Sequence, residues 1–393
     1  MTAPKPLLDT FAIETLWTEE QRMIRDTVRA FAREVFEPRI TACYRDETFP
    51  DDLIPAIGQL GVLGANLQGY GCAGLDATAY GLIMRELEYV DSGLRSFASV
   101  QGALCMYPIW RFGTEEQKQR YLPRMATGEL IGCFGLTEPD SGSDPGSMRT
   151  RARKIDGGYV LDGAKMWITN APIAGLAVVW AKVDDGDADS IRGFLVERGT
   201  KGFTTPKMRD KMSLRASWTG EIVLEGCEIP DANLLPGVTG LKGPLSCLTQ
   251  ARYGIAWGAL GAAMCCHDTA LAYARERTQF GRPIAGFQLT QQKLVDMGAA
   301  IVKGHLLAAH LAALKEAGRL TPIQVSLGKR ENVGAALWIA RLARGILGGN
   351  GIMAEYPIMR HMANLESVYT YEGTHEVHTL AIGRALTGHS AFA

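Results

Sequence analysis

The spacing of apolar residues changes twice along the chain, and this pattern limits the possible folds more than any single motif does. Helical spacing dominates at first, as from Ile24 to Val35. Short alternating runs rich in Val, Ile, Thr, Trp and Phe then extend from Tyr159 to Leu235, with turn signals such as Asp184 to Gly186, which predicts antiparallel strands. Helical spacing returns after Pro244. We therefore expect an α+β fold with an N-terminal helical domain at 1–132, a β domain at 133–243 and a C-terminal four-helix bundle at 244–393.

Capping residues and prolines place several helix limits. Thr18 with Gln21, and Thr114 with Gln117, each match the capping box that opens a helix. A proline is expected to stop the helix that precedes it, because it lacks an N–H group and its ring clashes with the preceding turn. The sequence therefore predicts helix ends just before Pro38 and Pro108. The other predicted helices span residues 76–90, 92–106, 245–277, 287–317 and 322–347.

The composition excludes several classes of protein. A chain of 393 residues with 47% hydrophobic content and a net charge of −1 predicts a globular protein of two or three domains. Without a basic excess we expect no nucleic-acid binding, and no apolar run is expected to span a membrane. The start of the chain lacks a leader pattern, so we expect a cytoplasmic protein or, in a eukaryote, a processed form in the mitochondrial matrix. The eight cysteines lack CxxC spacing and the histidines lack a zinc pattern, so we expect reduced thiols and no metal site.

Two glycine-rich segments resemble ligand-binding loops. Gly69 to Gly74 matches GxGxxG, but no strand–helix–strand alternation surrounds it, so we interpret it as an inter-helix loop. Gly348 to Gly351 follows a long predicted helix. It could be a helix C-cap and turn, or a place where the backbone approaches a ligand, and position alone leaves both open.

Two polar segments could carry chemistry. Phe134 to Asp144 combines hydroxyl groups, glycines and acids in one loop, which suits a polar ring edge and a pyrophosphate but also an ordinary solvated loop. Tyr371 to His378 places Glu372 on a glycine-containing turn between apolar stretches. A carboxylate there could be partly desolvated, which raises its proton affinity and makes it a usable general base. The alternative is a helix N-cap loop with solvated charges.

Arg95 is a candidate receptor for a carboxylate. It falls in the first turn of a helix capped by Asp91 or Ser92, and a helix N-terminus together with a guanidinium attracts an anion. The alternative is a surface arginine paired with Asp91. Side chains within reach that could add hydrogen bonds or orient the guanidinium are Ser96, Ser99 and Glu88.

Several of these segments together resemble the acyl-CoA dehydrogenase family of flavoproteins. The resemblance runs in order from about Thr18 to Gly388 and agrees with the helical–β–helical layout. Its motifs are the segments 134–144, Trp167–Asn170, Arg277–Gly281, Leu347–Gly351 and Tyr371–Thr374.

The resemblance implies a bound FAD and a homotetramer in which neighbouring subunits share each cofactor site. Residues of the β domain would hold the flavin and pyrophosphate: Phe134, Leu136, Thr137, Gly142, Ser143, Trp167, Ile168 and Thr169. Residues of the last third would contact the FAD of a neighbouring subunit or its phosphates: Arg277, Phe280, Gln288, Gly345, Leu347, Gly348, Gly349 and Thr374. Many family members carry glutamine where this chain has Gly345, so a side-chain contact there is not expected.

The resemblance also places Glu372 at the position of the catalytic base. Some branches carry that acid on the helix near Leu245, but the stretch Thr249–Gly254 has none. Arg252 would support coenzyme A binding or the loop that carries Glu372. Ser143, Tyr371 and Gly373 would add substrate contacts.

Within the family, Arg95 together with the segments Cys133–Thr137, Arg252–Gly258 and Asn364–Glu366 resembles the branch that acts on glutaryl-CoA, a dicarboxylic acyl thioester. This implies that Glu372 removes the α-proton, that a hydride passes to flavin N5, and that the product loses CO₂ to give crotonyl-CoA. Electrons would pass to an electron-transferring flavoprotein. The alternatives are dehydrogenation of another short-chain acyl-CoA, dehydrogenation of glutaryl-CoA without decarboxylation, an oxidase that reduces O₂ directly, and a non-catalytic acyl-CoA-binding scaffold.

Overall fold

The first third of the chain is helical, as predicted. The structure is a computed structural model that describes residues 6–183 and 190–392, so the predicted turn at Asp184–Gly186 lies outside the described residues. Both predicted capping boxes are confirmed, at the starts of α2 and α8. The α-helices of this part are α1 (Leu7–Thr10), α2 (Glu19–Phe31), α3 (Glu37–Asp46), α4 (Ile54–Gln59), α5 (Ala77–Val90), α6 (Ser92–Ser99), α7 (Tyr107–Phe112) and α8 (Glu115–Ala126).

Pro38 and Pro108 do not end helices, and these two predictions are wrong. The chain is π-helical over Ala32–Phe36 and Val100–Met106, and α3 and α7 follow directly. Each proline lies in the first turn of the helix that follows. A missing N–H group removes little from a first turn, and the π-helical segment before it lets the backbone enter a new helix without a loop.

The middle of the chain forms one seven-stranded sheet in the order β1-β4-β2-β3-β7-β6. The seventh strand, β5, lies off this path and pairs with β4 alone. Most neighbours are antiparallel, as predicted, but β4 runs parallel to both β1 and β2. The sequence gives no sign of these parallel pairs because they join segments that are far apart in the chain. The strands are β1 (Gly132–Gly135), β2 (Arg151–Ile155), β3 (Gly158–Thr169), β4 (Leu176–Val183), β5 (Ile191–Glu197), β6 (Phe203–Thr204) and β7 (Thr219–Pro230).

The last third is helical again. A short hairpin separates α9 from α10, and its strands are β8 (Thr278–Gln279) and β9 (Arg282–Pro283). The helices are α9 (Lys242–Glu276), α10 (Gln288–Glu316), α11 (Pro322–Ile346), α12 (Ile358–Thr370) and α13 (His375–Thr387).

Helix α10 bears on one expectation from the sequence. By length and composition it could cross a membrane, with a mean hydropathy of 1.4 over its most apolar window, so these two criteria do not support the expectation that the chain lacks a run of this kind. Six alanines and six leucines among its 29 residues raise the mean, although charged and polar residues interrupt the apolar runs. The helix packs against α5, α9 and α11. Length and composition therefore identify a bundle helix as readily as a membrane span.

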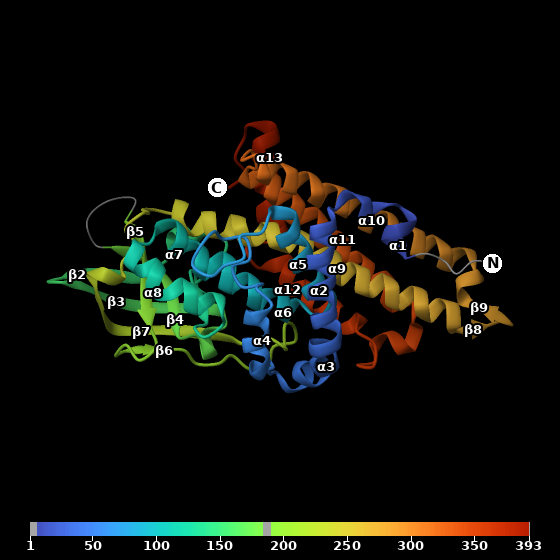
Figure 1. Cartoon of the computed structure of the whole chain (residues 1–393), viewed down its shortest axis with the longest axis horizontal. Coiled ribbons are helices and arrows are strands. Elements are labelled where there is room, and N and C mark those ends of the chain that lie inside the picture. Colours follow the sequence, from blue (N-terminus) through green and yellow to red (C-terminus); the bar gives the residue numbers. More distant parts are fainter. Residues whose placement is uncertain (1–5, 184–189, 393) are drawn as a thin grey trace.

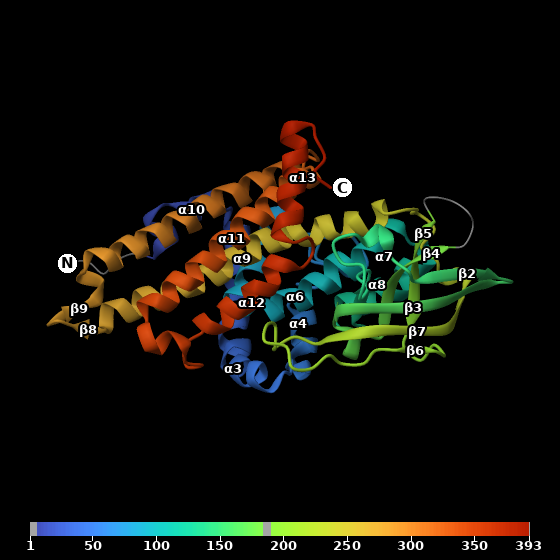
Figure 2. The same cartoon turned by 180° about the vertical axis from the view of Figure 1, so that it is seen from behind.

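The two helical parts of the chain share one core. Leu87 of α5, Leu260 of α9 and Val333 of α11 belong to the same buried cluster. Figures 1 and 2 show α9, α10 and α11 as long neighbouring rods, with the large sheet at one end of the molecule and the β8–β9 hairpin at the other. Helices α5 and α6 lie between these ends, where they meet α9 and α12. The exact domain boundaries stay predictions.

Candidate active site

Arg95 lies at the centre of the molecule rather than on its surface. Asp91 caps α6 by accepting a hydrogen bond from the Gly93 N–H at 2.7 Å. The Arg95 side chain is only 1% exposed, and its Nε donates to Glu88 Oε2 at 2.6 Å. Its Nη2 donates to the Tyr371 hydroxyl. Burial lowers the pKa of Arg95, but the nearby Glu88 carboxylate and Tyr371 raise it above its ordinary value, so the guanidinium stays charged.

The partner of Arg95, Glu88, is itself fixed by Ser92 and Gly258, whose contacts with Glu88 the sequence did not indicate. Glu88 Oε1 accepts a hydrogen bond from Ser92 Oγ at 2.7 Å. Gly258 of α9 faces the same ion pair: a Cβ there would overlap the Glu88 carboxylate and would lie 3.2 Å from Arg95 Nε. Glycine at this position therefore gives the buried ion pair its space. Helical spacing alone did not single out Gly258, because α9 contains glycine and alanine throughout.

Glu372 lies in the short loop between α12 and α13, next to Arg95. Its backbone has a left-handed φ of +53°, and its Oε2 atom is buried without a hydrogen-bond partner among the described residues. Burial raises its pKa, and the cations Arg95, Arg252 and Lys329 oppose that rise. A carboxylate with raised proton affinity and a free oxygen atom can accept a proton from a ligand.

The remaining predicted substrate contacts divide into two groups. Ser96 Oγ lies 3.5 Å from the Tyr371 hydroxyl, which places it beside Arg95. Ser99 Oγ is buried without a hydrogen-bond partner among the described residues. Gly373 adjoins Glu372, where a Cβ would lie 3.2 Å from Arg252 Nη2. Ser143 is instead exposed on a loop of the sheet domain. The Tyr80 hydroxyl, which the sequence did not indicate, is a further buried polar group without a partner in the described part of the chain.

Arg252 contacts the loop of Glu372 directly. Its Nε donates to the Glu372 carbonyl at 2.6 Å, which is one of the two roles expected for it. Burial lowers the pKa of Arg252, and the Glu372 carboxylate raises it in part.

The predicted flavin residues of the sheet domain form two adjacent segments. The Met166 N–H donates to the Thr137 carbonyl at 2.9 Å, which joins the loop after β1 to the end of β3. Trp167 occupies an irregularity in the β3–β7 pairing with a φ of +63°, and it is 58% exposed. Gly142 and Ser143 are exposed and Thr169 is half-buried. The side chains that contribute to the domain core, and so offer a ligand mainly their backbone groups, are those of Phe134, Leu136 and Ile168.

A buried ion pair between Lys165 and Glu138 holds the loop after β1 in place. Lys165 Nζ donates to Glu138 Oε1 at 2.8 Å and to the Leu136 carbonyl at 3.1 Å. Glu138 also accepts hydrogen bonds from the backbone N–H groups of Arg149 and Thr150, at 2.5 and 2.9 Å. These bonds fix the backbone on both sides of Thr137. The sequence placed Glu138 inside the motif but gave no sign of its partner.

The other predicted cofactor residues lie mostly at the end of the folded molecule that is opposite the sheet domain. Arg277, Phe280 and Gln288 are exposed around the β8–β9 hairpin, far from the sheet domain (Figure 1). The turn after α11 lies beside them, because Asn350 Nδ2 donates to the hydroxyl of Tyr273 near the end of α9 at 3.0 Å. Gly345 in the last turn of α11 is exposed, as are Gly348 and Gly349 in the turn that follows, and Leu347 is buried. Thr374 is separate from both sets and caps α13 through the Val377 N–H. One chain therefore does not bring the two sets together.

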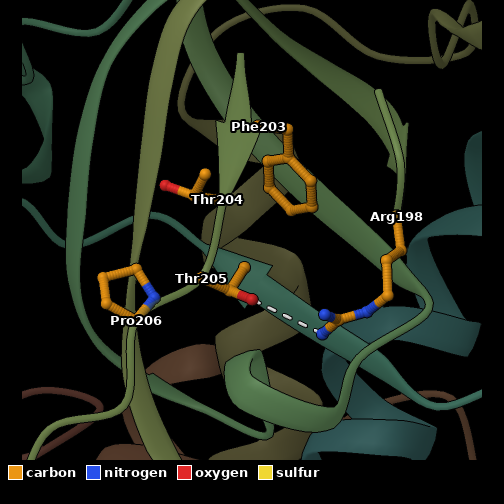
Figure 3. A pocket seen from close by; sticks show the side chains of 5 residues that line it. All are labelled: Arg198, Phe203, Thr204, Thr205 and Pro206. Carbon is orange, nitrogen blue, oxygen red and sulfur yellow. Dashed lines mark hydrogen bonds between the residues drawn. The ribbon is translucent and has the colours of Figure 1, made fainter. Parts of the chain in front are cut away.

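A surface pocket lies elsewhere on the sheet domain (Figure 3). Its Arg198 donates to the carbonyls of Ala174 at 2.6 Å and Pro172 at 3.0 Å, and to Thr205 Oγ1 at 3.4 Å. The guanidinium is thus used in holding neighbouring loops together, and the pocket shares no residue with the cluster around Glu372. Its lining residues are Arg198, Phe203, Thr204, Thr205 and Pro206.

Comparisons with known proteins agree with the order of the domains and with the fold. Family models described as the N-terminal, middle and C-terminal domains of acyl-CoA dehydrogenase match residues 18–129, 133–227 and 239–387. An acyl-CoA dehydrogenase of Bacillus subtilis is 38% identical over 94% of this chain and 99% of its own length. Two crystal structures of glutaryl-CoA dehydrogenase from Mycobacterium smegmatis, one in complex with FADH2, superpose with a TM-score of 0.97. They are 56% and 51% identical, and in both cases the match covers 99% of this chain and 100% of the other.

Proposed function

Because the chain belongs to the acyl-CoA dehydrogenase family, whose enzymes use FAD, we propose that it oxidises glutaryl-CoA and releases the distal carboxyl group as CO₂. The product would be crotonyl-CoA. In this proposal Glu372 is the base and Arg95 selects the dicarboxylic acyl chain.

The observation that carries this proposal is a buried guanidinium beside the candidate base. The Arg95 cluster contains three basic side chains, Arg95, Arg252 and Lys329, and two carboxylates, Glu88 and Glu372, so its basic groups outnumber its acidic ones before a ligand enters. Among the described residues Arg95 makes no hydrogen bond through Nη1. A substrate carboxylate would supply both the missing charge and an acceptor. A neutral acyl chain would supply neither.

The residues of the sheet domain fit FAD. An indole that is largely exposed on a left-handed backbone is unfavourable alone, and an aromatic ring system stacked on Trp167 would cover it. The exposed loop around Gly142 and Ser143 offers backbone N–H and hydroxyl donors for phosphate oxygens. When bound, FAD supplies the acceptor for the hydride that leaves the β carbon.

Glu372 would perform both proton transfers. Its ionised carboxylate takes the α-proton, and the electron pair of the broken C–H bond moves toward the thioester oxygen. Within residues 6–183 and 190–392, the backbone N–H of Glu372 donates to no other group, so it can stabilise that oxygen. Because the side chain has a buried, unpaired oxygen, the proton it takes is shielded from solvent and can be returned later.

The pairing of Arg95 with Glu88 also suits loss of CO₂. When the bond to the carboxylate carbon breaks, its electron pair moves into the conjugated chain toward the thioester, and the Glu372 proton completes crotonyl-CoA at the far carbon. A cation that bound the carboxylate with its full charge would oppose this step. Glu88, within 2.6 Å of Arg95 Nε, weakens that hold while it keeps the guanidinium in place.

Two partners belong to the same proposal. The cofactor residues at the two ends of the molecule could meet if a second copy brought its hairpin to this sheet domain. Apolar residues exposed near the hairpin support such an assembly. We therefore propose a homotetramer. An electron-transferring flavoprotein would reoxidise the reduced cofactor.

Substrate preference tests the role of Arg95. Wild-type protein should process glutaryl-CoA with at least about 10²-fold higher kcat/KM than butyryl-CoA, because a neutral chain leaves the guanidinium unpaired. The double variant Arg95→Gln/Glu88→Gln removes both charges, avoids leaving one of them buried alone, and should abolish the preference. Arg45→Gln, which removes an exposed arginine, is the matched control. Equal efficiency of wild-type protein on both substrates would exclude the proposed specificity.

A further inference from the structure

The loop that carries Glu372 has an unfavourable backbone conformation that contacts from outside the loop must stabilise. It spans only residues 371–374 between α12 and α13. Glu372 and Gly373 are both left-handed, with φ values of +53° and +94°. A non-glycine residue in this region costs about 1–3 kcal/mol and persists only where surrounding contacts enforce it. Contacts from outside the loop must therefore fix the orientation of Glu372.

Two cations from different helices make those contacts, on three successive carbonyl groups. Lys329 Nζ of α11 donates to the Tyr371 carbonyl at 2.7 Å and to the Gly373 carbonyl at 2.6 Å. Arg252 Nε of α9 donates to the carbonyl between them, that of Glu372, at 2.6 Å. Lys329 thus bridges the peptide units on both sides of the candidate base.

Among the described residues, Lys329 makes no hydrogen bond outside this loop. It is 1% exposed, and it forms no ion pair within 4 Å in the described part of the chain. A buried ammonium is costly unless polar groups compensate it, so a lysine kept only for packing would be a poor choice here. The bond to Gly373 lies beyond the end of α12, which shows that Lys329 does more than cap that helix.

We propose that Lys329 is a positioning residue for the base: it locks the left-handed turn so that the Glu372 carboxylate points into the Arg95 cluster, and its positive charge favours the ionised carboxylate. The inference rests on the proposed role of Glu372. It assigns Lys329 no contact with substrate.

Lys329 and Glu372 shift each other's pKa in opposite directions. Burial raises the pKa of Glu372, and Lys329 is one of three cations that lower it. Burial lowers the pKa of Lys329 itself, and Glu372 opposes that change. Removing the ammonium should therefore raise the pKa of Glu372 further. The titratable and charged groups that face Lys329 from the elements around it are Glu372, Arg252, Arg95, Glu376, His375 and His378.

The test is the pH dependence of anaerobic flavin reduction by glutaryl-CoA in FAD-loaded protein. Lys329→Met keeps the length but removes donors and charge. We expect its rate constant at saturating substrate to fall about 10²-fold, the effect of misplacing a reacting group by about 1 Å. Substrate affinity should change little, and the acidic limb of the profile should move to higher pH. Lys329→Gln keeps two N–H donors without charge, so it should recover part of the rate but keep the shifted limb.

Controls separate positioning from stability. Lys211 also donates to two carbonyls, those of Leu214 and Ser217, in a loop of the sheet domain, so Lys211→Met measures the general cost of losing such a lysine. FAD content and thermal melting are recorded for every variant, and Lys329→Gln carries the test should Lys329→Met lose FAD. Lower melting with wild-type rate and an unmoved pH profile would reduce Lys329 to a structural residue and overturn the proposal. Residual flavin reduction in Glu372→Gln would instead overturn the assignment of the base.

Discussion

At the residue scale, Gly258 determines whether the buried ion pair can form. A methyl group there would overlap the Glu88 carboxylate, so Gly258→Ala should displace Glu88 and with it Arg95. We expect kcat/KM for glutaryl-CoA to fall about 10²-fold, because a charge-assisted hydrogen bond of about 1.5–3 kcal/mol is lost or distorted. Gly383→Ala on α13, where a Cβ meets nothing within 4 Å, is the control. Unchanged kinetics in Gly258→Ala would show that the pair tolerates the displacement.

The raised pKa of Glu372 makes a second prediction at this scale. The base works only when ionised, so the rate of flavin reduction should rise with pH and be lost as pH falls through the Glu372 pKa. Because burial raises that pKa, the acidic limb should lie above the ordinary glutamate value of about 4.3. Stopped-flow reduction across pH measures it, with Glu372→Gln as the inactive reference. A limb at or below the ordinary value would contradict a desolvated base.

The sequence indicated part of this site and missed the rest for a physical reason. Arg95 and Glu372 lie in short motifs with local signals, a helix N-terminus and a glycine turn. Gly258 of α9 faces Glu88 of α5, and Lys329 of α11 holds the loop between α12 and α13, so both act through contacts that only folding creates. Local spacing carries no information about such contacts.

At the element scale, α6 depends on a buried cap. Asp91 accepts from Gly93 N–H and from Asn364 Nδ2 at 2.9 Å, and Arg360 lies 3.6 Å away. Asp91→Ala should cost about 3 kcal/mol or more, since it leaves a largely buried arginine without its partner. Thr18→Ala, at the exposed cap of α2, should cost about 1 kcal/mol. Thermal melting of the FAD-loaded variants compares them, and equal losses would contradict the role given to burial.

Secondary structure followed from the sequence where its causes are local. Both capping boxes and the three long C-terminal helices are found within a few residues of their predicted limits. The helix ends predicted at Pro38 and Pro108 were wrong because the π-helical segments before these prolines depend on packing. The two parallel strand pairs were missed for a similar reason: they depend on the path of the whole chain.

At the scale of the whole molecule, the separation of the two cofactor sets predicts that assembly and FAD binding depend on each other. Phe280 at the hairpin is 94% exposed, and in the proposed tetramer a neighbouring subunit would cover it. Phe280→Ser should weaken FAD retention about tenfold or more, about 1.4 kcal/mol, and lower the tetramer fraction. The flavin-to-protein absorbance ratio and light scattering measure both. Met23→Ser, which alters an exposed apolar residue of α2, is the control. A monomer that keeps its FAD fully would contradict shared sites.

The most direct test of the central claim is anaerobic mixing of the FAD-loaded protein with glutaryl-CoA, with flavin absorbance and released CO₂ followed together. Oxidative decarboxylation predicts bleaching of the flavin, with CO₂ and crotonyl-CoA formed in equal amounts. Bleaching without CO₂ would contradict decarboxylation. No bleaching with glutaryl-CoA, but bleaching with butyryl-CoA, would contradict the role of Arg95 and the assigned substrate.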